Sequence, residues 1–188
     1  MSSVFSPTRH KWSADQFEKL GQAGVLGEDA RVELINGEMI EMAPIGSRHA
    51  SAVNTLSMLL ARAVGESAIV STQNPLRLSE DSEPQPDLML LAPKPDRYRA
   101  ALPRPQDVLL LIEVADTTVA YDRGTKLPLY ARQGVPEVWL IDLDGKRLEV
   151  YREPGAAGYG RSLDLGAGDS ISPAALPAVA LPLRDILA

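Results

Sequence analysis

The segment from Val108 to Ala115 constrains the fold of this chain more than any other. Its residues, VLLLIEVA, are too continuously apolar for a strand with one face in water, so we predict a strand at the buried centre of a sheet. One acid, Glu113, lies inside this run. A buried carboxylate is costly unless a proton, a cation or a metal compensates its charge.

A second acid and a lysine suggest what compensates Glu113. Pro86-Asp87 opens another apolar strand, and Lys126 follows Glu113 by thirteen residues. Two carboxylates on neighbouring strands, with a lysine nearby, suggest a site for a divalent metal. Hard cations such as Mg²⁺ prefer carboxylate and carbonyl oxygens, so Asp87, Glu113 and the backbone carbonyl of Val114 are the candidate ligands.

Such a site has a definite chemistry. A bound metal polarises a phosphate oxygen and lowers the pKa of a bound water. Lys126 could orient that water or stabilise charge in the transition state, and Glu33 could meet the metal directly or through water. Each residue also has a structural interpretation. Asp87 could cap a loop, Glu113 could pair with a buried arginine, and Lys126 could lie in solvent.

Composition bounds the class of protein. The chain has 188 residues, 45% of them hydrophobic, which is enough for one domain with a substantial core. We expect an N-terminal tail over residues 1–12 and a single domain over 13–188. There is no apolar run of about 20 residues and no signal-like N-terminus, so we expect a cytoplasmic protein without membrane contact. The absence of cysteine excludes disulfides and thiolate zinc sites.

Local patterns predict the order of elements. Ser13 and Gln16 form a capping-box pattern, and Asn36-Gly37 fits a type I′ turn in a hairpin. Ser47 is a candidate cap for the helix that follows. We predict helices from Ser13 to about Gly24, over 48–65 with an apolar stripe that includes Ala63, and over part of 120–133 with Pro128 in its first turn; strands over 31–35, 38–42, 68–72, 75–78, 87–91, 108–115, 137–143, 147–152 and 159–165; and a loop over 92–106. This order predicts an α/β (α+β) fold with a mixed central β-sheet flanked by helices, an N-terminal helix and a β-hairpin.

Several segments resemble one known family. They are RVELINGE (31–38), QPDL (85–88), IEV (112–114), YDRGTKL (121–127) and YARQGVPEVWLID (130–142). Together they are similar to the Uma2 family of bacterial restriction-endonuclease-like proteins in the PD-(D/E)xK nuclease superfamily. The resemblance covers about residues 13 to 187. It implies a four-stranded mixed core sheet flanked by helices, a divalent metal, and hydrolysis of phosphodiester bonds.

The resemblance also assigns roles by position. Asp87 matches the acid of the Pro-Asp element, and Glu113 matches the acid of the E-x-K element. The slot two residues after Glu113 holds Ala115 instead of lysine. In this family the lysine is expected on the following helix, which is Lys126 here. Glu33 matches an acid with a supporting role at the metal.

Other polar residues have two interpretations each. His49 resembles a helix histidine of the family and could transfer a proton or contact phosphate, or it could be a partly buried structural residue. Gln73 could orient Lys126 or a water, or form a hydrogen bond across strands. We expect Asp116 to cap a helix, Asp142 to form a turn, and Tyr130 and Trp139 to lie in the core.

Positive charge on this chain must be local, because the formal net charge is −6. The segment from Lys94 to Arg104 holds Lys94, Arg97, Arg99 and Arg104 against one acid, Asp96. It is either a solvated loop or a phosphate-binding surface. Arg123 could likewise contact phosphate, or pair with Asp122.

These observations leave two functional hypotheses. The first is an endonuclease that uses Mg²⁺ or Mn²⁺ to hydrolyse DNA. The second is a catalytically inactive nuclease fold that binds DNA or another protein, which the alanine at position 115 and the acidic charge favour. A homodimer is possible, with the apolar segment Leu176 to Leu187 as an interface or as a lid on the core. A hydrolase of another kind lacks support, since there is neither a G-x-S-x-G nucleophile elbow nor a glycine-rich phosphate loop.

Overall fold

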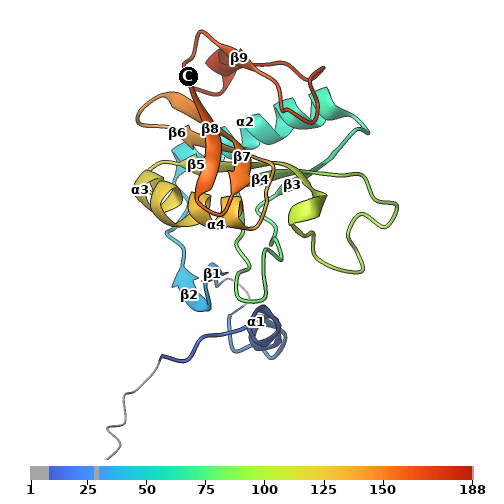
Figure 1. Ribbon diagram of the computed structural model, residues 1–188, viewed down its shortest axis with the longest axis vertical. Helices are drawn as coiled ribbons and strands as arrows, with labels where there is room; N and C mark the ends of the chain where they lie inside the picture. Colours follow the sequence, from blue (N-terminus) through green and yellow to red (C-terminus); the bar gives the residue numbers. More distant parts are fainter. Residues whose placement is uncertain (1–8, 28–29, 188) are drawn as a thin grey trace, which may run out of the picture.

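A six-stranded mixed sheet forms the centre of the protein in the computed structural model, which describes residues 9–27 and 30–187 (Figure 1). The strands follow each other in space in chain order, and every neighbouring pair is antiparallel except β5 and β6. The strands are β3 (Ile69–Thr72), β4 (Leu88–Leu91), β5 (Val108–Ala115), β6 (Glu137–Asp142), β7 (Arg147–Gly155) and β8 (Gly158–Leu165). The predicted mixed α/β architecture is confirmed, and the sheet extends beyond the four-stranded core that the resemblance implies.

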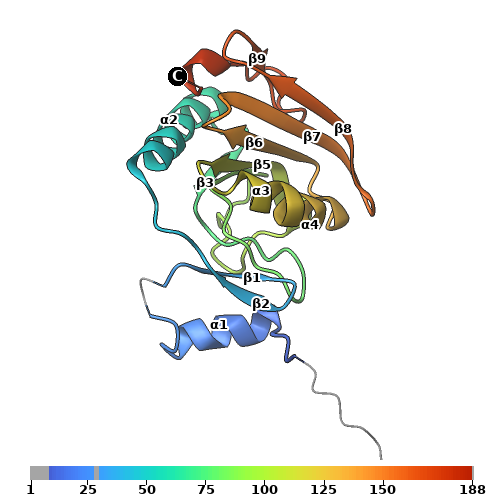
Figure 2. The same cartoon turned by 90° about the vertical axis from the view of Figure 1, so that its left-hand side faces the viewer.

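Strand β5 lies in the interior of the sheet, as the sequence predicts. Its side chains alternate between two hydrophobic layers, because successive residues of a strand point to opposite faces. Leu110, Ile112 and Val114 belong to the layer that includes α2 (Ser47–Val64). Leu111 and Ala115 belong to the layer that includes α4 (Leu127–Arg132). Glu113 lies on the same face of the strand as Leu111 and Ala115, so its side chain points towards α4. Figure 2 shows helices on both sides of the sheet.

The connection from β5 to the parallel strand β6 is helical but not regular. It consists of α3 (Val119–Tyr121), a π-helical turn η2 (Asp122–Lys126), and α4. The amide of Leu127 donates to the carbonyl of Asp122, five residues earlier. Pro128 lies in the first turn of α4, as predicted. Proline has no N–H, and its ring clashes with the carbonyl four residues earlier in a regular helix, which favours the wider turn. This π-helical turn was not predicted.

A helix and a hairpin form a separate layer at one end of the molecule (Figures 1 and 2). Helix α1 (Ala14–Gln22) begins at the predicted capping box, in which Ser13 and Gln16 each bond the other's backbone N–H. Strands β1 (Val32–Ile35) and β2 (Glu38–Glu41) pair in the predicted hairpin. The φ angles of Asn36 and Gly37 are 51° and 80°, as a type I′ turn requires.

Three local predictions are wrong. Residues 75–78 form no strand, because their amides bond to loop carbonyls instead of a ladder, Leu76 to Pro84 and Arg77 to Pro103. Ser47 is the first residue of α2 and makes no capping bond. Ala63 is exposed although the predicted apolar stripe includes it.

The C-terminal segment packs on the body, on the same side of the sheet as α2 (Figure 2). Val179, Leu181, Leu183 and Ile186 are buried there. The segment includes β9 (Ser170–Ile171), β10 (Leu181–Pro182) and a 3₁₀ turn η3 (Leu183–Asp185), and a second 3₁₀ turn, η1 (Pro105–Asp107), precedes β5. It therefore covers the core in the way that a lid would.

Two other expectations concern the N-terminal tail and contact with a membrane. Most of the predicted N-terminal tail, residues 1–8, lies outside the described residues, while the amide of Trp12 bonds to the carbonyl of Gly37. None of the described helices combines the length and apolarity that crossing a membrane requires.

Glu137 anchors the C-terminal segment to the sheet. It is 1% exposed, and its Oε1 accepts hydrogen bonds from Trp139 and Arg152. Its Oε2 accepts from the amide of Ala174 at 2.6 Å, while Arg152 also donates to the carbonyl of Ser172. A buried carboxylate with this many donors holds its charge at little cost, and it fixes where the chain crosses the sheet.

Glu137→Ala is expected to lower the free energy of unfolding by about 3 kcal/mol, because Arg152 would keep its charge without a partner. Urea unfolding measures the change. Glu66→Ala, at an exposed position, should change it by less than about 0.5 kcal/mol. Equal effects of the two substitutions would contradict the anchoring role.

Arg77 connects α1 to the loop that supports the hairpin. It bonds Asp15 and Glu18 of α1, both at 2.8 Å, and lies 3.4 Å from Glu83. The backbone of Glu83 pairs with Leu34 of β1, which buries its side chain. Burial, reinforced by the charge of Glu18, raises the pKa of Glu83 to about 7 although Arg77 lowers it.

This raised pKa predicts a pH dependence of stability. The folded protein keeps the Glu83 proton to a higher pH than the unfolded chain does, so this group destabilises the fold as the pH rises from about 4.5 to about 7. Glu83→Gln removes the ionisation. Its unfolding temperature should match that of the original protein near the lower pH and exceed it near the upper one. Glu80→Gln, at an exposed position, should unfold at the same temperature as the original protein at both pH values. A pH-dependent difference in this control would show that Glu83 is not the cause.

Candidate functional site

Strand register brings the two predicted acids together. Leu88 of β4 pairs with Ile112 of β5, so one step along each strand sets Asp87 opposite Glu113. Opposed residues of an antiparallel pair lie on the same face, with Cβ atoms about 5 Å apart. The amide of Val114 donates to Oδ2 of Asp87 at 2.9 Å, which fixes this carboxylate at the end of the sheet.

Lys126 lies between two acids from different parts of the chain. Its Nζ is 3.0 Å from Oε1 of Glu33 and 3.3 Å from Oε1 of Glu113. All three side chains are almost fully buried. Tyr130 follows Lys126 by one helical turn, and its hydroxyl donates to the same oxygen of Glu113 at 2.6 Å. The amide of Gln85 donates to Glu33 at 2.7 Å.

The charges of this group depend on each other. Burial alone would lower the pKa of Lys126, but the charges of Glu113, Glu33 and Asp122 outweigh it and raise that pKa above its usual range. Lys126 therefore remains a cation. Burial raises the pKa of Glu113 to about 8, with the acids around it adding to the shift and Lys126 opposing it. Burial also raises the pKa of Asp122, which accepts a hydrogen bond from Thr118 at 2.7 Å.

These residues border a cleft of about 550 Å³ between the hairpin, the start of α2 and the helical connection. Its lining is strongly acidic. Six carboxylates and three basic side chains contribute to it, namely Glu33, Glu41, Asp87, Glu113, Asp116 and Asp122 against Arg31, His49 and Lys126. An excess of buried acid favours uptake of a cation or of protons.

His49 and Gln73 both contact Asp87. The Nε2 of His49 lies 3.0 Å from Oδ1 of Asp87, and this hydrogen bond raises the pKa of His49 although burial opposes it. The Nε2 of Gln73 donates to the same oxygen at 3.4 Å, across strands β3 and β4. Gln73 therefore makes the hydrogen bond across strands that was one of its two interpretations, and its hydrogen bond goes to Asp87 instead of Lys126.

The oxygen ligands of the site suit a hard cation. Their side chains, however, are not arranged around a common point where a cation would bind. Oxygen ligands on neighbouring strands suit Mg²⁺ or Mn²⁺. Within the described part of the chain, Oε2 of Glu113 accepts no hydrogen bond and remains available at the cleft. In that same part, no group of three or more His, Asp or Glu side chains has the geometry of a metal site. Lys126 fills the space between Glu33 and Glu113, which explains why these carboxylates do not have the geometry of a metal site.

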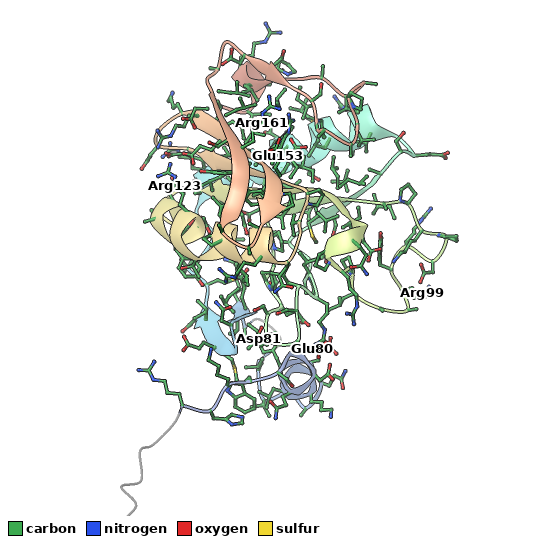
Figure 3. All side chains as sticks on the ribbon, viewed as in Figure 1. Glu80, Asp81, Arg99, Arg123, Glu153 and Arg161 are labelled. Carbon is green, nitrogen blue, oxygen red and sulfur yellow. The ribbon has the colours of Figure 1, made fainter. Side chains whose placement is uncertain are left out.

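The predicted phosphate-binding residues lie outside the cleft. Lys94 pairs with Asp107 at 2.8 Å and lies over the ring of Tyr98, while Arg97 and Arg99 are exposed on the same loop. Arg123 bonds to Glu149 of β7 instead of Asp122. Figure 3 shows Arg99 and Arg123 on opposite sides of the molecule.

Four other expectations concern single residues. Trp139 is buried in the core as predicted, and Asp142 forms the predicted turn by accepting from the amide of Gly145 at 2.7 Å. Asp116 does not cap a helix but pairs with Arg48 at 3.1 Å. Tyr130 is fully buried as predicted, yet its contact with Glu113 was missed. Its position four residues after Lys126 is the sequence signal that could have revealed it.

Comparisons with known proteins agree with the fold. A crystal structure of a putative nuclease belonging to DUF820 from Anabaena variabilis has the same fold, with a TM-score of 0.72 at 17% sequence identity. The match covers 93% of this chain and 97% of that chain. No curated protein matches the sequence. The family described as "Uma2: Putative restriction endonuclease" matches residues 14–184. The chain therefore belongs to the Uma2 family.

Proposed function

We propose that this protein is an endonuclease that requires Mg²⁺ or Mn²⁺ and hydrolyses phosphodiester bonds in DNA. The observation that carries the proposal is the meeting of Asp87, Glu113 and Lys126 in one acidic cleft, although they come from two strands and a helical connection. Membership of the family described as "Putative restriction endonuclease" supports the same conclusion.

In the proposed mechanism, Asp87 and Glu113 would hold the cation, the Val114 carbonyl would add a third oxygen, and Glu33 would contribute directly or through water. When bound, the metal polarises a phosphate oxygen and makes a water molecule more acidic. The ammonium of Lys126 would donate a hydrogen bond to the attacking water or to a phosphate oxygen on which negative charge develops. His49 keeps Asp87 in place through its 3.0 Å contact, and as a cation it offsets part of the acidic charge.

The basic side chains outside the cleft have a smaller role in the proposed function. Lys94, Arg97 and Arg99 lie on one exposed loop, where they could contact phosphates distant from the cut. Cutting both strands of a duplex requires two active sites or two encounters, and a homodimer would satisfy that requirement.

A second function is favoured by a specific observation. Lys126 already compensates Glu33 and Glu113, so the buried acids have a cation of the protein's own. Such an internal pair would suit a catalytically inactive nuclease fold that binds DNA or a protein partner. Metal binding separates the two functions, since only the enzyme needs it.

Substituting either acid should remove activity. We expect Asp87→Asn or Glu113→Gln to lower cleavage of a supercoiled plasmid in Mg²⁺ at least about 100-fold, since each replaces a carboxyl group that can ionise to bind a hard cation and keeps the side-chain shape. Far-UV circular dichroism checks that the variants fold. Asp164→Asn, on the exposed face of β8, is the matched control and should cleave normally. Full activity in either acid variant would refute the assignment.

Calorimetric titration with Mn²⁺ tests the cofactor directly. We expect the purified protein to bind the ion at a site that Asp87→Asn abolishes and Asp164→Asn retains. If no heat of binding is detected at millimolar Mn²⁺ but the protein binds DNA, the result would instead support the catalytically inactive nuclease fold.

A further inference from the structure

Two polar atoms at the border of the cleft have no partner. Among the described residues, the buried side-chain atoms without a hydrogen bond are Nδ1 of His49, Oε2 of Glu83 and the hydroxyl of Tyr121. His49 and Tyr121 both line the cleft. Leaving a buried hydroxyl unpaired costs stability, so an unpaired one at a binding site indicates a ligand that completes it.

Tyr121 lines the cleft together with Glu33, Glu113 and Lys126. It ends α3, directly before the π-helical turn that carries Lys126. Burial raises the pKa of Tyr121, and the acids Glu33 and Asp122 add to this effect. The hydroxyl therefore keeps its proton at neutral pH and remains able to donate.

The cationic side chains of the cleft are partly engaged by groups of the protein itself. Lys126 bonds to Glu33 and Glu113, and Nε2 of His49 contacts Asp87. An Nη of Arg31 donates to the carbonyl of Ala43.

A phosphate group offers only acceptors, and carboxylates cannot donate to it. A cleft lined with acids therefore needs an uncommitted donor if it is to hold a phosphodiester.

We propose that the Tyr121 hydroxyl donates a hydrogen bond to a non-bridging oxygen of the phosphodiester in the cleft. This inference rests on the proposed nuclease function. It makes Tyr121 a substrate-contacting residue, distinct from the acids that hold the cation. It also gives the hydroxyl a role at a position where a phenylalanine would leave no buried atom unpaired.

Tyr159 provides a matched comparison. Its hydroxyl donates to the carbonyl of Val135 at 2.9 Å, and the residue is not part of the cleft lining. Tyr159→Phe therefore removes an existing hydrogen bond within the protein. Tyr121→Phe removes none, and any loss it causes must come from the substrate.

The test compares Tyr121→Phe with Tyr159→Phe in thermal unfolding and in cleavage of a fluorescent DNA oligonucleotide with Mg²⁺. We expect Tyr121→Phe to unfold at the same temperature as the original protein or higher, with kcat/KM lowered about ten- to hundredfold. Tyr159→Phe should show the reverse, with a lower unfolding temperature and normal kcat/KM.

Each result decides the inference. Normal cleavage by Tyr121→Phe, or a lowered unfolding temperature that accounts for the lost activity, would overturn the role of Tyr121 while leaving the proposed function intact. If the original protein neither cleaves nor binds the oligonucleotide, the proposed function fails, and the assignment of Tyr121 fails with it.

Discussion

The buried contact of Lys126 with Glu33 and Glu113 is the interaction on which the site depends. It joins the N-terminal hairpin, the central strand and the helical connection, which are far apart along the chain. A buried ion without a partner costs several kcal/mol, so each of the three segments is constrained by the other two. The hairpin lies beside the end of the sheet for this reason, in addition to its apolar contacts.

The π-helical turn determines where that ammonium can reach. In this turn the amide of Leu127 bonds five residues back, which widens the helix at the point where Lys126 leaves it. Pro128 then begins α4, in which Tyr130 lies one turn after Lys126. Both side chains therefore contact Glu113. Local backbone chemistry at a proline thus decides the geometry of a contact between distant residues.

Much of the fold could be predicted because it depends on local rules. A continuous apolar run predicts a central strand, Asn36-Gly37 predicts the turn, and Ser13 with Gln16 predicts the start of a helix; all three are confirmed. The pairing of Arg123 with Glu149 depends instead on how β7 aligns with β6, which periodicity does not specify. Residues 75–78 have strand-like composition, but their backbone partners are loops.

The candidate site likewise includes residues that the sequence could reveal and residues that it could not. The acids at its centre could be found because a carboxylate in an apolar strand is anomalous wherever the strand lies. The hydroxyl groups around them are harder to find, since tyrosine in an apolar segment is equally typical of a core, and only the spacing of Tyr130 from Lys126 indicates its role. The hydroxyl of Tyr130 donates to Glu113, whereas the hydroxyl of Tyr121 has no partner among the described residues.

Ala115 shows why the position of the ammonium matters more than the segment that supplies it. This residue is two positions after Glu113 on the same face of β5, and it is fully buried in the layer with α4. A lysine there would displace apolar side chains from that layer. Lys126 reaches the same carboxylate from the helical connection and leaves the layer packed. The charge at Glu113 is thereby balanced from a helical connection that also borders the cleft.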